Sequence, residues 1–314
     1  MVTRREFVKS VSAASFSAAY IASGLSRTLA GASSMKFGYA AITWGNKVTD
    51  AIDDIAAVGF RGIQLRVGDG TFDKYGSSPA ALRDLLAQRA LAFPVLSSGN
   101  LVIEPSVERD ELAKHTRHAK FLHDAGGQWL QVIDERPKGR AVTADDYRRV
   151  GRLLTELGKR TTDAGATLVY HHHMNSTGEK PLEIAAVLDA ADRRHVRLLF
   201  DVAHYQEGGG DPVGAIRQYR EWIEVVHLKD VRPGRAGQAG QAGRSGGQAG
   251  GSGYEFVELG RGRVDLAGCF AALREIGFDK WAIVELDRVP DPGRTPKESA
   301  EINKRFIVDH GFTI

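Results

Sequence analysis

The sequence has almost no cysteine and little net charge, and each absence narrows what the protein can be. Cys269 is the one cysteine among 314 residues, so no disulfide can form within the chain. It lies in an apolar helical pattern, which is typical of a buried small residue rather than a nucleophile. The net charge of +3 is small for this length and gives no case for nucleic-acid binding. The fold must therefore be held by its apolar core.

The first residues have the order of an export signal. A basic start containing Arg4-Arg5 precedes a weakly apolar stretch, and Ala30-Gly31-Ala32 forms a small-residue cleavage site. The apolar stretch is short and diluted by Ser, Ala and Gly, so we expect no stable membrane span in the mature protein. The basic start resembles the twin-arginine consensus, which implies export of a folded protein. We expect a twin-arginine signal peptide at 1–32 and a periplasmic or otherwise exported protein at 33–314; an ordinary basic signal and an uncleaved anchor are the alternatives.

From residue 36 onward, short apolar runs alternate with longer amphipathic segments. This alternation predicts parallel strand–helix–strand units. About eight such units favour the α/β class and a single closed (β/α)8 TIM barrel. An open doubly wound sheet is the alternative, and the lack of a glycine-rich phosphate loop after the first predicted strand disfavours it. The predicted strands cover residues 36–41, 62–66, 92–98, 129–133, 166–170, 196–200, 223–226 and 281–284.

One segment breaks the alternation. Residues 233–253 are rich in glycine and have almost no apolar side chains, so they cannot form a core. We expect a flexible surface loop between the seventh strand and its helix. A tolerated insertion is the simpler interpretation, and a lid over the catalytic face is the alternative.

Polar side chains follow five consecutive predicted strands. The carboxyl ends of barrel strands carry the active site in this architecture, so these side chains are expected to meet. Side chains alternate along a strand, so His171 and His173 can share a face that His172 avoids. Imidazole and carboxylate groups together suit Mn, Zn, Co, Fe or Mg. The strand-end residues are Glu135, His171, His173, Asp201, His204, His227, Lys229 and Glu285.

Several motifs carry a family resemblance. FGYAAITW begins at Phe37, and YHHHM begins at Tyr170. The longest stretch covers residues 198–232; it begins with LLFDVAHY and ends with HLKDVR. FVELGRGRVD and WAIVELDR follow. These stretches resemble the xylose isomerase-like barrel superfamily of sugar isomerases, epimerases and related lyases, and within it the inosose dehydratases. HLKDVR and GRGRVD are the most specific of them.

The resemblance implies a metal ligand set. The superfamily usually places Glu, Asp, His and Glu on one divalent metal, and Asp201, His227 and Glu285 match the last three. His171 stands where the first Glu is usual, as in the dehydratase branch, and Glu135 is a compensating carboxylate. The second strand also departs from the family, because it carries Gln64 where a Glu is common.

The resemblance also implies a reaction. Members remove a proton next to the carbonyl of a sugar or cyclitol, with the metal as Lewis acid. We expect Glu285 or a group behind the metal ligands as base, and Lys229 or His204 either to donate a proton to the leaving hydroxyl or to stabilise charge. The missing fifth-strand Glu favours dehydration or aldose–ketose isomerisation over two-carboxylate epimerisation.

Other interpretations of the sequence remain. A non-catalytic periplasmic sugar-binding barrel is the alternative, and a DNA-repair nuclease would need more metal ligands and a basic face. A homo-oligomer is compatible with the sequence. The expected substrate contacts are Trp44, Glu135 and His173.

Overall fold

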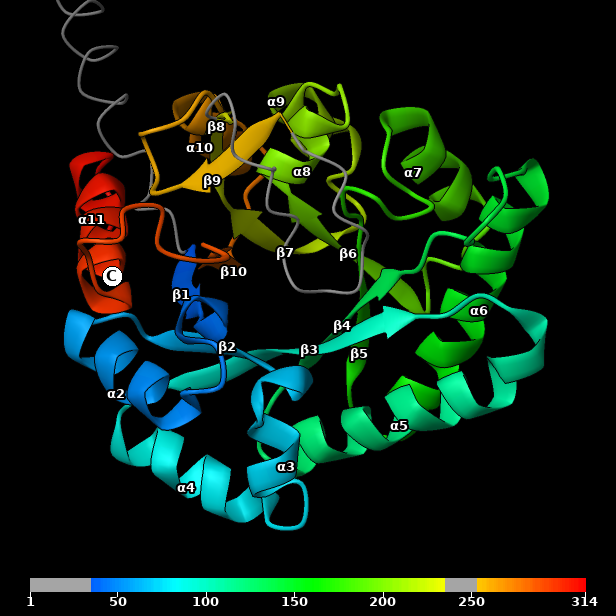
Figure 1. Cartoon of the computed structure of the whole chain (residues 1–314), viewed down its shortest axis with the longest axis horizontal. Helices are drawn as coiled ribbons and strands as arrows, with labels where there is room; N and C mark the ends of the chain where they lie inside the picture. The colour runs from blue at the N-terminus through cyan, green and yellow to red at the C-terminus, as the bar shows by residue number, and fades with distance from the viewer. Residues whose placement is uncertain (1–34, 235–252) are drawn as a thin grey trace, which may run out of the picture. The chain divides into compact units, whose positions relative to one another are not determined.

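Eight parallel strands close into a barrel in the computed structural model, which describes residues 35–234 and 253–314. Around the ring the order is β1-β10-β7-β6-β5-β4-β3-β2, and neighbouring strands pair in parallel (Figure 1). This confirms the single (β/α)8 barrel expected from the alternation of strands and helices. The barrel strands are β1 (Lys36–Ala40), β2 (Gly62–Arg66), β3 (Ala92–Leu101), β4 (Trp129–Asp134), β5 (Thr167–His171), β6 (Val196–Asp201), β7 (Ile223–Leu228) and β10 (Trp281–Val284).

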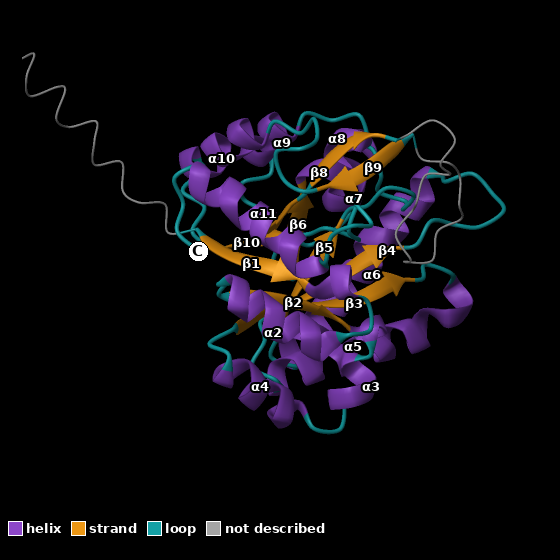
Figure 2. Cartoon of the chain, turned by 60° about the vertical axis from the view of Figure 1, so that its left-hand side comes forward, coloured by secondary structure: helices purple, strands orange, loops and turns teal. Residues whose placement is uncertain are grey.

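Helices cover the outside of the barrel (Figure 2). The longest, α6, begins at a reciprocal capping box in which Thr143 and Asp146 satisfy each other's backbone N–H groups. Short 3-10 turns at 41–44, 67–69 and 105–107 precede other helices. The helices are α2 (Val48–Val58), α3 (Thr71–Tyr75), α4 (Pro79–Gln88), α5 (Glu108–Asp124), α6 (Ala144–Asp163), α7 (Pro181–Asp189), α8 (Val202–Glu207), α9 (Pro212–Gln218), α10 (Leu266–Glu275) and α11 (Pro296–Asp309).

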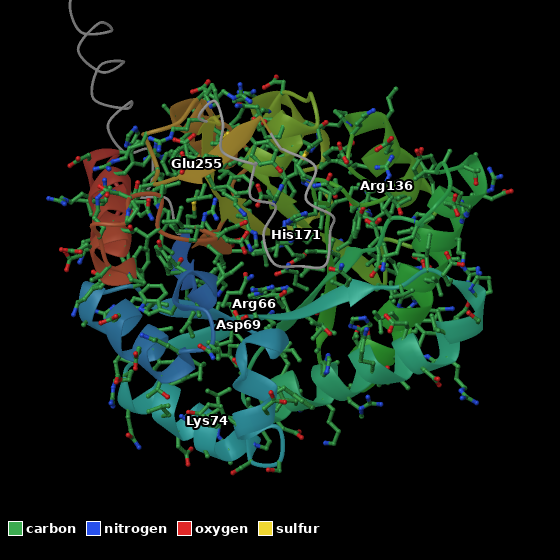
Figure 3. All side chains as sticks on the ribbon, in the orientation of Figure 1. Arg66, Asp69, Lys74, Arg136, His171 and Glu255 are labelled. Atoms are coloured by element: carbon green, nitrogen blue, oxygen red, sulfur yellow. The ribbon has the colours of Figure 1, made fainter. Side chains whose placement is uncertain are left out.

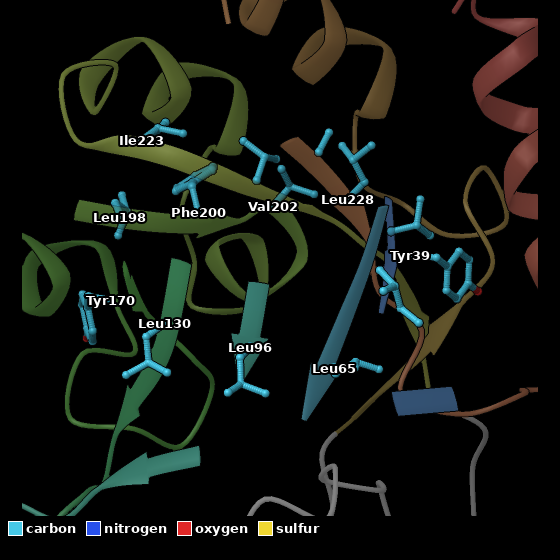
Figure 4. Close-up of a cluster of buried hydrophobic side chains, with 14 of the residues drawn as sticks. Tyr39, Leu65, Leu96, Leu130, Tyr170, Leu198, Phe200, Val202, Ile223 and Leu228 are labelled. Atoms are coloured by element: carbon cyan, nitrogen blue, oxygen red, sulfur yellow. The ribbon is translucent and has the colours of Figure 1, made fainter. Parts of the chain in front are cut away.

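Each strand buries both of its faces. The outer faces pack against the helices, and Figure 4 shows part of this layer, with Leu96, Leu130, Leu198 and Phe200 among its buried side chains. The inner faces form a separate apolar layer inside the barrel. Burial on both faces explains why the strands appear in the sequence as continuous apolar runs. The inner apolar layer contains Ala40, Val95, Trp129, Val169, Leu199, Val225, Trp281 and Ile283.

A ring of polar side chains lies directly above the inner apolar layer. On six strands a polar residue follows an inner apolar residue after two positions, so both point into the barrel. The step from Val169 to His171 on β5 and the step from Leu199 to Asp201 on β6 are examples. We call this ring the polar layer: Ser97, Gln131, His171, Asp201, His227 and Glu285.

Two local features differ from the sequence-based expectation. The chain forms helix α8 immediately after β6, where no helix was predicted. An antiparallel hairpin of β8 (Asp230–Pro233) and β9 (Tyr254–Val257) flanks the glycine-rich segment, where only a loop was expected. The apolar alternation of these short strands and an ion pair between Arg232 and Glu255 stabilise the hairpin.

Two expectations fall outside the described residues. The predicted signal peptide at 1–32 does so entirely, and the glycine-rich loop at 233–253 does so for residues 235–252. Among the residues that the structure describes, no helix combines the length and the apolar character needed to cross a membrane.

Candidate metal centre

Four strands bring ligand-type atoms together in the polar layer. Asp201 Oδ2 lies 3.4 Å from His227 Nδ1 and 3.6 Å from His171 Nε2. Glu285 Oε2 lies 3.3 Å from the same His227 nitrogen. All four side chains are buried, and Figure 3 places His171 within the ring of strands. Two carboxylates and two imidazoles at this spacing are a ligand set for a divalent transition metal.

The hydrogen bonding of these atoms supports the same interpretation. His171 Nε2, Asp201 Oδ2 and His227 Nδ1 are buried and have no hydrogen-bond partner among the described residues. A buried polar atom without a partner costs about 1–3 kcal/mol, so three that converge on one point indicate a missing common partner. Possible metal ligands form two compact, overlapping groups of described residues, Asp201–His227–Glu285 and His171–Asp201–His204. The residues present therefore fit a divalent metal.

Asp201 has a second role that fixes its orientation. Its other oxygen, Oδ1, accepts hydrogen bonds of 2.9 Å from the backbone N–H groups of Ala203 and His204. The side chain is thus the N-cap of α8. One oxygen is held by the helix, and the other points into the site.

Lys229 is a buried cation beside the cluster. Its ammonium group donates a 2.9 Å hydrogen bond to Glu285 Oε2 and a shorter one to Asp287, and it lies 4.0 Å from the centre of the Phe256 ring. Burial alone would lower the pKa of Lys229, but the charges of Asp287 and Glu285 outweigh burial and raise it. Lys229 therefore remains charged and forms an ion pair with Glu285.

A turn next to the site explains the two most specific motifs. Asp230, in HLKDVR, accepts backbone hydrogen bonds from Gly260, Gly262 and Val264 in GRGRVD. A Cβ atom on Gly262 would lie 2.2 Å from the Asp230 carboxylate, so the turn needs glycine there. The two motifs thus form one structural unit that supports Lys229.

Comparison with known proteins identifies the family. The model of the xylose isomerase-like TIM barrel family matches residues 52–307. The chain belongs to this family. The inosose dehydratase of Lacticaseibacillus casei is 30% identical over 300 residues, which cover 87% of this chain and 96% of that protein. Inosose dehydratase 1 of a Bacillus cereus strain is 28% identical over 295 residues, with 87% and 96% covered.

Solved structures share the fold of this xylose isomerase-like barrel. The IOLI protein with a bound zinc atom gives a TM-score of 0.73 at 19% identity, with 88% of this chain and 98% of that chain covered. The probable 3-DHS dehydratase AsbF from Bacillus anthracis gives 0.70 at 18% identity, with 87% and 99% covered. At these identities the likeness concerns the architecture.

A cavity of the barrel opens beside the cluster. His171, His173 and Glu285 line it, together with Arg66 and Asp287. His173 thus lies beside the candidate metal centre. Figure 3 shows Arg66 beside Asp69 at the β2 side of the ring, and the two form an ion pair of 3.3 Å.

The two other predicted substrate contacts lie elsewhere. Trp44 is buried, donates its indole N–H to Asp54 of α2 and packs edge-on against Tyr39. The residue of that segment that lines the cavity is Ile42. Glu135 forms an ion pair of 2.7 Å with Lys138 and is not among the cavity-lining residues. Neither side chain is brought to the cluster.

The rings of His173 and His204 lie in contact at the edge of the site, tilted by 42° to each other. Their ring centroids are 3.8 Å apart. His173 Nδ1 donates to the carbonyl of Met174, so its Nε2 carries a free lone pair. Burial lowers the pKa of both rings, and for His204 the neighbouring His173 adds to the effect. Both imidazoles are therefore neutral at pH 7, and His173 has the freer proton-accepting atom.

The structure adds residues that sequence reasoning did not select. Gln131 hydrogen bonds to His171, and Arg66 and Asp287 line the cavity. Gln131 could have been found from its position two residues after Trp129, which is an inner apolar residue. Arg66 ends β2 and has no neighbouring polar motif, so the sequence carries no comparable signal for it.

We expect the metal-free protein to lose stability as the pH rises from 6.5 to about 9. Burial alone would lower the pKa of His227, but the nearby carboxylates of Glu285 and Asp201 raise it to about 9. A raised folded-state pKa gives stability that is complete below the unfolded value of 6.5 and is lost as pH passes the folded value. The expected loss is about 3 kcal/mol at most. Urea unfolding of chelator-treated protein across this range measures it.

The control for this pH dependence is His227→Gln. Burial lowers the pKa of His171 to about 4 and that of His172 to about 3, so their contributions change below pH 6.5. The variant should therefore show a flat stability between pH 6.5 and 9. An equal slope in wild type and variant would contradict the assignment to His227.

Proposed function

We propose that this chain is a metal-dependent enzyme that removes a proton next to a carbonyl group of a sugar or cyclitol, as a dehydratase or an aldose–ketose isomerase. The observation that carries the proposal is the convergence of three unpartnered buried atoms, from His171, Asp201 and His227, beside Glu285. The similarity to inosose dehydratases supports the same class of reaction. A divalent metal held by these residues would polarise the substrate carbonyl as a Lewis acid.

We assign the proton transfer to His173 in preference to Glu285. Glu285 is a poor base, because the His227 and Lys229 charges hold its pKa well below its usual range against the effect of burial. His173 presents a free Nε2 atom at the cavity, with its other nitrogen fixed by Met174. A neutral imidazole in this position can accept a proton from the carbon next to the carbonyl.

In the dehydration the atoms balance without a further reactant. His173 accepts the proton from the carbon, and the electron pair of that C–H bond forms the new carbon–carbon double bond. The hydroxyl on the adjacent carbon leaves and takes the proton from His173, so water is released. Lys229 stays protonated and balances the charge of the carboxylates around the site. In the isomerisation the electron pair of the C–H bond forms an enediol instead. His173 returns its proton to the former carbonyl carbon, while the hydroxyl proton on the deprotonated carbon moves to the former carbonyl oxygen, so a new carbonyl forms next to the old one.

We further propose that the enzyme is exported. The twin-arginine-like start supports this, and free sugars or cyclitols then fit better than phosphorylated ones. The alternative function is a periplasmic sugar-binding barrel without catalysis. Such a protein would have no need for a set of metal ligands.

Solvent exchange tests the proposed chemistry. Metal-loaded protein is incubated with inosose and with keto-sugars in deuterated water, and products are followed by NMR. We expect deuterium next to the carbonyl of at least one compound and water loss from inosose. His173→Gln should retain metal and lose exchange. Binding without exchange in every compound would contradict the proposal and favour the sugar-binding alternative.

A further inference from the structure

A chain of buried hydrogen bonds crosses the barrel and joins two histidines of the candidate metal centre. His227 Nε2 lies 2.9 Å from Gln64 Oε1, Gln64 Nε2 donates to Gln131 Oε1 at 2.8 Å, and Gln131 Nε2 lies 2.7 Å from His171 Nδ1. Both glutamines are buried, with exposed fractions of 0% and 2%. In each ring, the nitrogen that hydrogen bonds to a glutamine is turned away from Asp201, and we call it the far nitrogen. The near nitrogens, His227 Nδ1 and His171 Nε2, face Asp201.

The direction of such a chain is constrained. A carboxamide has a donor end and an acceptor end, so two of them in series carry hydrogen bonds one way only. If His227 donates to Gln64, then Gln64 donates to Gln131 and Gln131 donates to His171. Turning both amides over reverses every bond. In either direction one ring has its hydrogen on the far nitrogen, and the other ring accepts there. The constraint therefore holds whichever way the amides are oriented.

This constraint limits metal binding. A neutral imidazole binds a metal through the nitrogen that carries no hydrogen, so a ligand must have its hydrogen on the far nitrogen. Only one of His171 and His227 meets this condition while the chain is intact. For both to do so, the amide nitrogens of Gln64 and Gln131 would face each other as donors. A buried polar group left unpaired in this way costs about 1–3 kcal/mol.

We propose that Gln64 and Gln131 are positioning residues that commit the metal to Asp201, His227 and Glu285 and leave His171 as an N–H donor. The inference rests on the metal binding of the proposed function. It changes the expected role of His171, which is then not the fourth ligand.

Charge decides between the two directions. The group around His227 offers two carboxylates to a cation, and the group around His171 offers one. Lys229 does not distinguish the groups, because its ammonium lies 2.9 Å from Glu285 Oε2 in the first and 3.5 Å from His204 Nε2 in the second. The second carboxylate of the first group is therefore what favours a cation there. With the metal at the first group, the His171 N–H points toward Asp201 Oδ2, 3.6 Å from its nitrogen, and toward the cavity.

NMR of the protein with isotope-labelled histidine and an NMR-active cadmium isotope tests this directly. We expect one imidazole nitrogen coupled to cadmium, and its loss in His227→Gln. His171 should carry its hydrogen on Nε2 with and without cadmium. Two coupled nitrogens, or one that belongs to His171, would overturn the inference. If cadmium does not bind, the metal dependence in the proposed function fails, and the position of the His171 hydrogen in the metal-free protein still decides the direction.

Gln131→Glu tests the chain itself. A carboxylate accepts at both ends, so His171 and Gln64 can both donate to it, and the directional constraint disappears. We expect two coupled nitrogens and about tenfold tighter cadmium binding. Ser97→Asp is the matched control, because it adds the same charge to the polar layer on the strand paired with Gln131 but leaves the chain intact. It should still give one coupled nitrogen. One coupled nitrogen in Gln131→Glu would show that the glutamines do not set the ligand.

Discussion

Asp201→Asn is expected to weaken metal binding and activity strongly while leaving helix α8 in place. The two carboxylate oxygens have separate tasks: Oδ1 caps α8, and Oδ2 has no hydrogen-bond partner among the described residues and points into the site. The amide oxygen of Asn can take over the cap, but its NH₂ group offers no lone pair to a metal. Metal affinity should fall at least about 100-fold. Turnover should fall roughly 1000-fold, because Lewis-acid stabilisation is worth several kcal/mol.

Asp134→Asn is the matched control for this variant. Asp134 is also a buried Asp at the end of a barrel strand, with an exposed fraction of 1%. Its oxygens accept hydrogen bonds from the Tyr170 hydroxyl and from the backbone of Thr177 and Gly178, away from the metal cluster. This variant should lose about 1–2 kcal/mol of stability and keep its metal. Calorimetric titration with zinc and metal analysis of the purified proteins distinguish the two outcomes.

A second substitution separates the two roles of Asp201. Asp201→Ala removes the cap as well as the ligand, so it should unfold more easily than Asp201→Asn by about 1 kcal/mol in the absence of metal. Stoichiometric metal in purified Asp201→Asn would refute the assignment of Asp201 as a ligand. If Asp201→Asn is destabilised but still binds zinc as wild type does, then Asp201 only caps α8 and does not bind the metal.

The sequence predicted the architecture because periodicity is local. Each barrel strand is buried on both faces, so it stands out as an apolar run between polar turns. The polar layer follows from the same local rule, since a polar residue two positions after an inner apolar one must point inward. For this reason the strand-end pattern included His171, Asp201, His227 and Glu285 among its candidates, and the family resemblance then singled them out as the ligand set.

Relations between distant residues could not be predicted in the same way. Gln64 and Gln131 are 67 positions apart, and their hydrogen bond depends on how the barrel closes. The sequence also does not show how Trp44 points. It was predicted to contact the substrate, but in the structure its indole N–H donates to Asp54 on α2. Helix α8 was not predicted, because nothing in the sequence distinguishes an Asp that ends a strand from one that also caps a helix.

Lys229→Met is expected to destabilise the protein by about 3–5 kcal/mol and to reduce activity strongly. Lys229 has an exposed fraction of 0%, and it pairs with Glu285 and Asp287, which are themselves largely shielded from solvent. Methionine fills much of the same volume beside Phe256 but leaves the two carboxylates without a counter-charge. Chemical denaturation of the metal-free variant measures the cost. Lys120→Met, which breaks the exposed pair with Asp124, should change stability by less than about 1 kcal/mol.

The double variant Lys229→Met, Asp287→Asn tests the cause of this loss. If uncompensated charge is responsible, removal of the Asp287 charge should recover part of the lost stability, so the two substitutions should be far from additive. If lost packing is responsible, the double variant should be no more stable than Lys229→Met. A gain of about 1 kcal/mol or more over the single variant supports the electrostatic cause.

Metal gives a further way to separate structure from chemistry at Lys229. In wild type the ammonium group donates to Glu285 Oε2, the same oxygen that lies 3.3 Å from His227 Nδ1. Lys229 therefore competes with a metal for this oxygen. Lys229→Met should bind zinc more tightly than wild type, and saturating zinc should restore much of its stability by binding the folded state. Activity should stay low, because the zinc-loaded variant lacks the buried positive charge beside Glu285 that balances the site during proton transfer. Zinc binding weaker than that of wild type would mean that Lys229 holds Glu285 in position for the metal instead of competing with it.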